Sequence, residues 1–261
     1  RKSLVGSEMC IRDSHIPEEF WPFESTFDFN GTAFKANLNS ILERNISKEP
    51  LKNELEVEQV EKELKNSTFF LKAVESRSQT SNPKPPFRTS TLQMAAASSL
   101  GFTADRTMQS AQKLYEGGFI TYLRTDGISI STSPNTGEPF SEENPGPPPL
   151  EEIRNFIRSN YAKTYLSKET RIFKSKVQNS QEAHEAIRPT DIFKTPKDTI
   201  LNADEAKLYE LIWNRTVASQ MESSKYERKT LVISSSDGKY EFRASSRKNI
   251  FQGFEILISA S

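Results

Sequence analysis

A proline cluster at residues 83–86 separates two kinds of sequence pattern. Proline and the residue before it resist helix, so the cluster predicts a boundary between structural elements. Before it, alternating apolar residues around an Asn-Gly pair predict a β-hairpin over residues 20–38. After it the pattern becomes helical, and strand patterns return near residue 230. This order predicts a multidomain α+β fold, in which a helical domain is inserted between two parts of a β-rich domain.

Local signals predict the individual elements. Amphipathic spacing, N-capping residues and C-terminal glycines predict helices over residues 48–66, 89–100, 103–117, 150–161 and 202–221, with Thr89 or Ser90 as the N-cap of the second. Strand patterns cover residues 69–75, 119–125, 230–234 and 240–244, and a proline-rich acidic loop covers 133–149. We therefore expect the first β-rich part in 15–82, the helical domain in 83–200, and a helix with the second, truncated β-rich part in 201–261.

The two ends of the sequence are unusual. The chain begins at Arg1 instead of Met, and it stops at residue 261 just after a strand-like run develops over 251–258, so we expect both ends to be cut. Residues 3–14 resemble a translated sequencing-adapter read-through, which predicts that 1–14, including Cys10, are not native. The alternative is an ordinary disordered N-terminal tail.

Composition excludes several classes of protein. No run approaches the roughly 18 apolar residues of a membrane span, and a single cysteine excludes a disulfide framework or a thiolate zinc site. The 17 Phe, 7 Tyr and 2 Trp are too many large apolar side chains for a wholly disordered chain. A soluble intracellular protein remains as the expectation.

The formal net charge is zero, from 35 basic and 35 acidic residues, but the charges are unevenly distributed. Basic residues are in excess in 69–125, 153–199 and 215–248, and the stretch 126–152 is acidic. This pattern is compatible with a surface that meets a polyanion. An ordinary solvated surface explains the pattern at least as well, so charge alone does not show whether the chain binds a polyanion.

The segment from Gly117 to Gly127 contains one candidate site. Alternate side chains of an extended strand share a face, so Tyr122 and Arg124 are expected to point together, with Cα atoms about 6.5–7 Å apart. Arginine holds phosphate oxygens, and a phenoxide can attack phosphorus. Without further information, a half-buried strand tyrosine beside a surface arginine is the simpler interpretation.

The segment from Ser180 to Asp191 contains a second candidate site. If it turns helically, His184 and Arg188 are neighbours on one face, with Glu185 close by and Pro189 ending the turn. A protonated histidine beside an arginine binds phosphate and can transfer a proton. Taken alone, a single histidine more often has a structural role.

Four motifs in one order resemble the signature of the type IA DNA topoisomerases, and especially of their bacterial members. They are Pro86-Phe-Arg-Thr-Ser-Thr-Leu-Gln93, Thr107-Met-Gln-Ser-Ala-Gln-Lys-Leu-Tyr-Glu-Gly117, Ile120-Thr-Tyr-Leu-Arg-Thr-Asp126 and Ala183-His-Glu-Ala-Ile-Arg-Pro-Thr190. The similarity continues in Leu208–Arg215, Ala218–Met221, Phe242–Ala244 and Phe251–Phe254, and covers about residues 16–258.

The resemblance implies roles for the motif residues. Tyr122 would be the nucleophile that forms a 5′-phosphotyrosyl bond, Arg124 would stabilise charge on the scissile phosphate, and His184 would lie beside that phosphate. Arg188 would lie there too, with Glu185 orienting its neighbours. Three further residues match a family segment facing the DNA groove and are expected to contact DNA, namely Thr89, Ser90 and Gln93.

The sequence also departs from the family pattern. Met94-Ala95 replaces the usual Gln-Glu, and Gly127 replaces a usual Ser. There is no Asp-x-Asp anywhere in the chain, whereas the family's metal-binding domain supplies an acidic cluster for Mg²⁺. The resemblance therefore implies a Mg²⁺ cofactor whose ligands are not in this chain, and no metal site within it.

The expected function is that of an isomerase. By resemblance, the chain is part of a monomeric DNA topoisomerase, cytoplasmic and nucleoid-associated, with the β-rich part forming an arch or gate. The whole enzyme would cleave and rejoin one strand of negatively supercoiled DNA without ATP. One alternative, which the missing acidic cluster favours for this fragment alone but not for the whole enzyme, is a catalytically inert module that binds single-stranded DNA. Another is a generic phosphoryl-transfer protein with His184 as nucleophile.

Overall fold

The computed structural model describes residues 21–136, 141–174 and 185–258. The chain divides into two compact units, one formed by residues 1–78 and 227–248 and the other by 79–226 and 249–261. The chain therefore passes between the units after residues 78, 226 and 248, whereas the sequence suggested boundaries after 82 and 200. The predictions for residues 1–14 and Cys10 lie outside the described residues.

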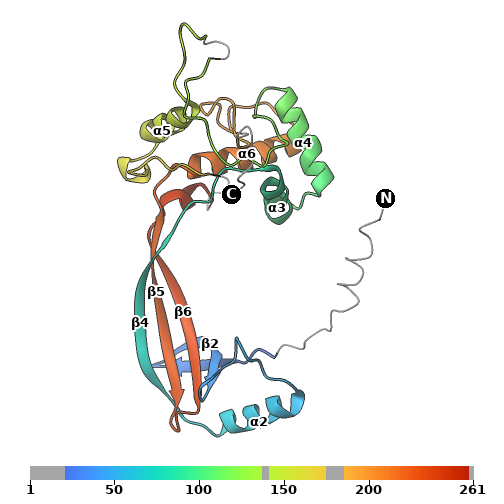
Figure 1. Cartoon of the computed structure of the whole chain (residues 1–261). Helices are drawn as coiled ribbons and strands as arrows, with labels where there is room; N and C mark the ends of the chain where they lie inside the picture. Colours follow the sequence, from blue (N-terminus) through green and yellow to red (C-terminus); the bar gives the residue numbers. More distant parts are fainter. Residues whose placement is uncertain (1–20, 137–140, 175–184, 259–261) are drawn as a thin grey trace, which may run out of the picture. The chain divides into compact units, whose positions relative to one another are not determined.

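The first unit is built on a six-stranded sheet (Figure 1). The strand order is β1 (Glu24–Phe29), β2 (Thr32–Ile41), β6 (Tyr240–Phe251), β5 (Ser224–Ser235) and β4 (Phe69–Ser81), with β3 (Arg44–Asn45) paired to β2. Strands β1 and β2 are antiparallel and are joined by Asn30 and Gly31, both at positive φ. The predicted hairpin is thus confirmed, and β4, β5 and β6 are all longer than the sequence patterns indicated.

Aromatic rings fill the core of the first unit. Phe27, Phe69 and Phe242 pack edge to face, with ring centroids 5.3–5.7 Å apart. This geometry favours the positive edge of one ring against the negative face of the next. Helix α2 (Glu54–Lys65), capped by the Asn53 side chain, buries Val60 in the same cluster.

Glu63 ties α2 to the β5–β6 hairpin. Its Oε2 accepts a hydrogen bond from the Tyr240 hydroxyl at 2.6 Å and pairs with the Lys239 ammonium. These two donors lower the pKa of Glu63 to about 2. Burial, together with the Glu63 carboxylate, raises the pKa of Tyr240 to about 12.

The second unit is a helical assembly around α6 (Ala203–Ala218) (Figure 1). Its other elements are α3 (Thr89–Leu100), α4 (Ala104–Glu116), α5 (Pro149–Asn160) and the short 3₁₀ helices η1 (Lys163–Tyr165) and η2 (Gly253–Leu257). Helix α6 packs against α3, α4, α5 and η2. It buries Leu208, Tyr209, Ile212 and Trp213 in one large core, which keeps α6 with the helical unit.

Capping residues decide where these helices begin and end. Thr103 caps α4 and Asn202 caps α6, as predicted, and Gly101 ends α3 in the left-handed conformation. Two details of the prediction are wrong. The N-cap of α3 is Arg88, because Thr89 already has helical geometry, and α6 ends at Ala218, before Met221.

The described residues thus form a mixed helix-and-sheet structure, as the predicted α+β class requires. Among these residues, no helix combines the length and the apolar character needed to cross a membrane.

We predict that Gly253→Ala destabilises the second unit far more than Gly101→Ala. Both glycines have positive φ, which costs an alanine about 1–2 kcal/mol. At Gly253 an added Cβ would also lie 2.5 Å from the Glu222 carbonyl oxygen, whereas nothing lies within 4 Å at Gly101. Urea unfolding should show a loss above about 2 kcal/mol for Gly253→Ala only. Equal losses in the two variants would contradict the close approach.

We predict that Glu63→Gln removes a stabilisation that depends on pH. A carboxylate whose pKa is depressed in the folded state stabilises the fold above its unfolded pKa, near 4.5, and this contribution is lost as pH falls towards about 2. Thermal unfolding of the variant should therefore begin at a lower temperature at pH 7, with the difference from the parent vanishing near pH 2. Glu58→Gln, an exposed position on the same helix, is the control. A constant difference across this pH range would contradict the prediction.

Candidate active site

The segment that carries Tyr122 is held on both sides by hydrogen bonds. On one side, the Thr121 amide donates to the Arg188 carbonyl at 2.9 Å, and the Thr121 hydroxyl donates to the Ala186 carbonyl at 2.8 Å. On the other side, the Thr89 hydroxyl donates to the Leu123 carbonyl at 2.7 Å. The segment therefore lies between the first turn of α3 and the chain that follows residue 184.

Thr89 and Thr125 form a reciprocal pair within this arrangement. The Thr89 amide donates to the Thr125 carbonyl at 3.0 Å, and the Thr125 amide donates to the Thr89 hydroxyl at 2.9 Å. The Thr125 hydroxyl donates in turn to the Glu185 carbonyl at 3.0 Å. The α3 N-terminus, the tyrosine segment and the second motif are thus joined through side-chain hydroxyls.

Tyr122 is accessible to a large substrate. Its side chain is 53% exposed, while its neighbour Leu123 is 1% exposed and anchors the segment in the core. The Tyr122 and Tyr115 rings pack edge to face, with centroids 5.4 Å apart. Tyr115 lies in the last turn of α4, so this helix supports one side of the candidate nucleophile.

The predicted strand over residues 119–125 is wrong. The structure has bends there and a single bridge between Ile120 and Pro189, because the segment bonds to a helix terminus and to an irregular segment instead of a sheet. Burial nevertheless alternates. Tyr122, Arg124 and Asp126 are exposed, and the residues between them are buried.

Arg124 lines a hollow at the start of α3. The hollow has a volume of about 390 Å³, and its lining residues are Arg88, Thr89, Ser90, Arg124, Thr125 and Asp126. The first turn of α3 contains no acidic residue, so the positive end of the helix dipole is uncompensated by its own sequence. Two arginines at such a helix terminus, against the single carboxylate of Asp126, favour an oxyanion such as phosphate.

The three residues of α3 that are predicted to contact DNA do not all line the hollow. Ser90 lines the hollow and is exposed. Thr89 also lines it, but its hydroxyl is engaged with the backbone of the tyrosine segment. Gln93 is half-buried one turn further along α3 and does not line the hollow.

Arg188 and Glu185 form a bidentate ion pair. The Arg188 Nε and Nη2 atoms donate to the two Glu185 oxygens at 2.8 and 3.1 Å, and the Arg188 side chain is only 11% exposed. Glu185 also accepts from the Ser131 amide at 3.0 Å. Each of the two charges is therefore already balanced inside the protein.

The described part of this segment does not meet the condition of a helical turn. Glu185, Ile187 and Pro189 each form an isolated bridge to another segment, so the backbone is extended there. The expected i,i+4 arrangement of His184 and Arg188 depends on helical geometry. His184 itself lies outside the described residues, so its role stays a prediction.

The acidic side chain of Glu152, in the first turn of α5, also lies near Arg188. Burial raises the pKa of Glu152, and the Arg188 charge opposes that rise. The negative charge of Asp191 acts in the same direction as burial. Arg188 thus has two carboxyl groups near it, Glu185 and Glu152, which favours a structural role for it in this arrangement.

Sequence reasoning overlooked three contributors to the site. Arg88 was quoted within the first motif but was given no role, although its position just before Thr-Ser placed it at the helix start. Tyr115 lies within the second motif and likewise has no predicted role of its own. Thr121 precedes Tyr122, yet its pairing with residues 186–188 depends on chain folding that no local pattern reveals.

The residues described here do not form a metal site. Within residues 21–136, 141–174 and 185–258, no three His, Cys, Asp or Glu side chains lie together as ligands. Mg²⁺ requires several oxygen ligands at short range. The donor set present therefore does not fit the Mg²⁺ that the resemblance implies, and no reaction step is derived through it.

Comparison with known proteins gives consistent matches. The family described as DNA topoisomerase matches residues 4–260. DNA topoisomerase 1 of Rickettsia bellii is 39% identical over 268 residues, covering 97% of this chain and 32% of the relative. The Helicobacter pylori protein of the same name is 37% identical, covering 98% of this chain and 33% of the relative.

The fold agrees with a solved structure. Full-length topoisomerase I from Thermotoga maritima has a TM-score of 0.64 and 32% sequence identity, covering 93% of this chain and 37% of that protein. The chain spans about a third of the length of the curated relatives named above. With four motifs in order, a family match over nearly all residues and this shared fold, the chain belongs to the bacterial type IA DNA topoisomerase family.

Proposed function

We propose that this chain supplies the strand-cleaving tyrosine and part of the gate of a DNA topoisomerase that relaxes negatively supercoiled DNA. The observation that carries the proposal is the position of Tyr122. It is half-exposed, braced by Tyr115, and two residues from an arginine that lines a hollow suited to phosphate. The named relatives, all called DNA topoisomerase 1, point to DNA as the substrate.

The cleavage step follows from these groups. The Tyr122 phenol oxygen attacks the phosphorus of one DNA strand and forms an O–P bond, while the bond from phosphorus to the 3′ oxygen breaks. The phenol proton is transferred, directly or through water, to the released 3′ oxygen. Arg124 and the α3 N-terminus stabilise the charge that develops on the phosphate oxygens.

Religation is the reverse of this step. The phosphotyrosyl bond retains the energy of the phosphodiester, so the 3′ hydroxyl can attack phosphorus and release Tyr122 without ATP. His184 is proposed to lie beside the same phosphate and to manage the proton. The family resemblance implies Mg²⁺ bound by residues outside those described here.

The alternative is a single-stranded-DNA-binding gate module that does not cleave DNA by itself. One observation favours it for the 261-residue chain alone, namely the lack of an acidic metal cluster among the described residues. The two functions differ in one product, a covalent bond between protein and DNA.

We predict that Tyr122→Phe abolishes covalent adduct formation, because no other group on this segment offers an oxygen nucleophile in the same position. The chain is incubated with a labelled single-stranded oligonucleotide and Mg²⁺ and analysed by denaturing gel electrophoresis. Any adduct that the parent chain forms should fall by at least about a thousandfold in Tyr122→Phe. Tyr115→Phe is the matched control, since it keeps the ring contact and loses only a hydroxyl, and should retain adduct.

Other outcomes of this experiment are equally informative. Binding without any adduct in the parent chain supports the gate module. An adduct that survives in Tyr122→Phe but disappears in His184→Ala would support the phosphoryl-transfer protein and contradict our proposal.

We predict that Thr89→Val lowers both stability and cleavage. The change keeps the side-chain volume but removes the hydroxyl that bonds to the Leu123 carbonyl and the Thr125 amide. Leaving these backbone groups without partners should cost about 1–3 kcal/mol in urea unfolding. Thr89→Ser retains the hydroxyl and should restore both quantities. Equal behaviour of the valine and serine variants would show that the hydroxyl does not position the segment.

A further inference from the structure

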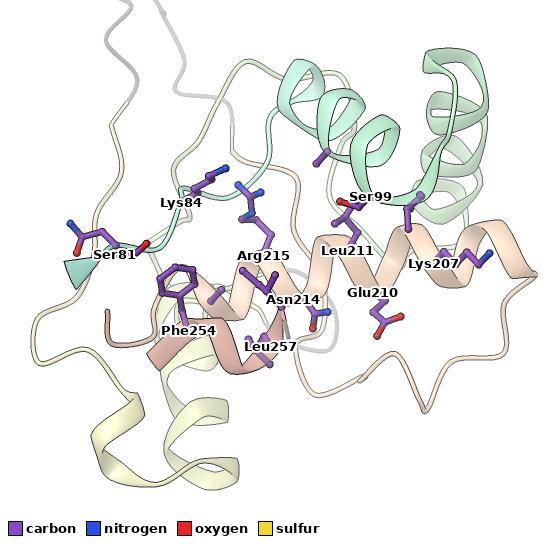
Figure 2. A pocket seen from close by; sticks show the side chains of 15 residues that line it. Ser81, Lys84, Ser99, Lys207, Glu210, Leu211, Asn214, Arg215, Phe254 and Leu257 are labelled. Carbon is purple, nitrogen blue, oxygen red and sulfur yellow. The ribbon is translucent and has the colours of Figure 1, made fainter. Parts of the chain in front are cut away.

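A second cavity lies in the helical unit and shares no lining residue with the hollow beside Tyr122. Its volume is about 510 Å³, within the usual range for ligand sites. Helix α3 contributes Ala95, Ser99 and Leu100, and α6 contributes residues from Lys207 to Ala218 (Figure 2). The segment 81–84 and η2 supply the remaining walls.

The charges that line this cavity are mainly positive. Lys84, Lys207 and Arg215 face it, against the single carboxylate of Glu210. Figure 2 shows the charged ends of Lys84 and Arg215 pointing toward each other. Within the described part of the chain, neither of these two cations forms an ion pair with a carboxylate. Two converging like charges repel unless an anion lies between them.

Arg215 is the more constrained of the two cations. Its guanidinium lies over the Phe87 ring, 4.3 Å from the centroid, and Nη1 makes one long hydrogen bond of 3.5 Å to the Pro85 carbonyl. Burial lowers the pKa of Arg215, and among the residues that the structure describes no charged neighbour contributes to this shift. Arginine stays protonated in proteins, so a desolvated charge without a counter-ion remains at this place.

The rest of the lining combines four polar residues, Ser81, Asn82, Ser99 and Asn214, with an apolar wall that includes one aromatic ring. Leu211 and Ala218 on α6, and Phe254 and Leu257 on η2, provide this surface. An apolar surface with an aromatic ring beside paired cations matches a base attached to a phosphate. Bases stack on aromatic side chains irrespective of sequence, and arginine and lysine hold the backbone phosphate.

We propose that this cavity binds one nucleotide of a single-stranded DNA segment, with its phosphate between Lys84 and Arg215 and its base against the apolar wall that includes Phe254. The identification of the polymer as DNA rests on the proposed function. Ser99 is nine residues along α3 from Ser90, which lines the hollow, or about 14 Å at 1.5 Å per residue. The cavity is thus a second contact point for DNA, separate from the place of cleavage.

The proposal is tested by charge reversal at the two exposed lysines. Binding of a fluorescent twelve-residue oligothymidylate to the 261-residue chain is followed by anisotropy at several salt concentrations. Lys84→Glu with Lys207→Glu should weaken binding by at least about tenfold and reduce the salt slope by about 0.7 for each phosphate that the variant no longer neutralises. Glu210→Gln, which removes the carboxylate, should strengthen binding.

The matched control reverses Lys163 and Lys168, which are exposed in the same unit and do not line the cavity. Reversing this pair changes the net charge by the same amount as Lys84→Glu with Lys207→Glu. Because neither lysine lines the cavity, this control should alter binding much less than the cavity variant does. Equal loss in both double variants, or no loss in Lys84→Glu with Lys207→Glu, would overturn the proposal. A third result would also overturn the proposal. In it, thymidine monophosphate binds through Lys84, but the lysine substitutions leave the affinity for the oligonucleotide unchanged.

A crosslinking experiment separates this proposal from that of the active site. An oligonucleotide containing 5-iododeoxyuridine is bound to the Tyr122→Phe variant and irradiated. Crosslinked peptides are then identified by mass spectrometry. A crosslink at Phe254 that persists in this variant supports the cavity independently of cleavage. Crosslinks confined to residues around Tyr122 would overturn the cavity proposal and leave the proposed function intact, whereas absence of any oligonucleotide binding would contradict both.

Discussion

The hydroxyl of Thr89 determines how the candidate nucleophile is presented. It donates to the Leu123 carbonyl and accepts from the Thr125 amide, so the backbone on both sides of Arg124 is satisfied without a regular strand. Buried backbone groups must find partners, and here a helix terminus and a second irregular segment supply them. Because Leu123 is anchored between these bonds, its neighbours Tyr122 and Arg124 remain at the surface.

The positive charges around this segment fall into two groups. Arg188 is shielded and is held by Glu185 in a bidentate pair, so it stabilises the fold of its own segment. Arg88 and Arg124 are exposed and line a hollow at a helix terminus that has no acidic first turn. The resemblance gave Arg188 and Arg124 the same phosphate to bind. In this structure Arg88 lines the hollow together with Arg124, and Arg188 pairs with Glu185, so the role of Arg188 beside the phosphate stays a prediction.

Local chemistry made much of the fold predictable from sequence. The Asn30-Gly31 turn, the Thr103 and Asn202 caps and the Gly101 terminus depend on neighbouring residues, and each is found where it was expected. The predicted strand at 119–125 failed because its partners, Thr89 and residues 186–188, are supplied by distant segments. An alternating pattern records which side chains are buried, and it cannot distinguish a sheet from an extended segment held by side-chain hydroxyls.

Arg188 and Arg215 show why counter-ions are a better guide to function than burial. Both guanidinium groups are partly withdrawn from water, which costs free energy unless an opposite charge is nearby. Arg188 has Glu185 and lies near Glu152, so its charge is balanced within the protein. Arg215 has an aromatic ring and one long carbonyl contact, and it faces a cavity that Lys84 also lines. An anion in that cavity would provide for Arg215 what Glu185 provides for Arg188, and a phosphate of bound DNA is the anion that this family's substrate offers.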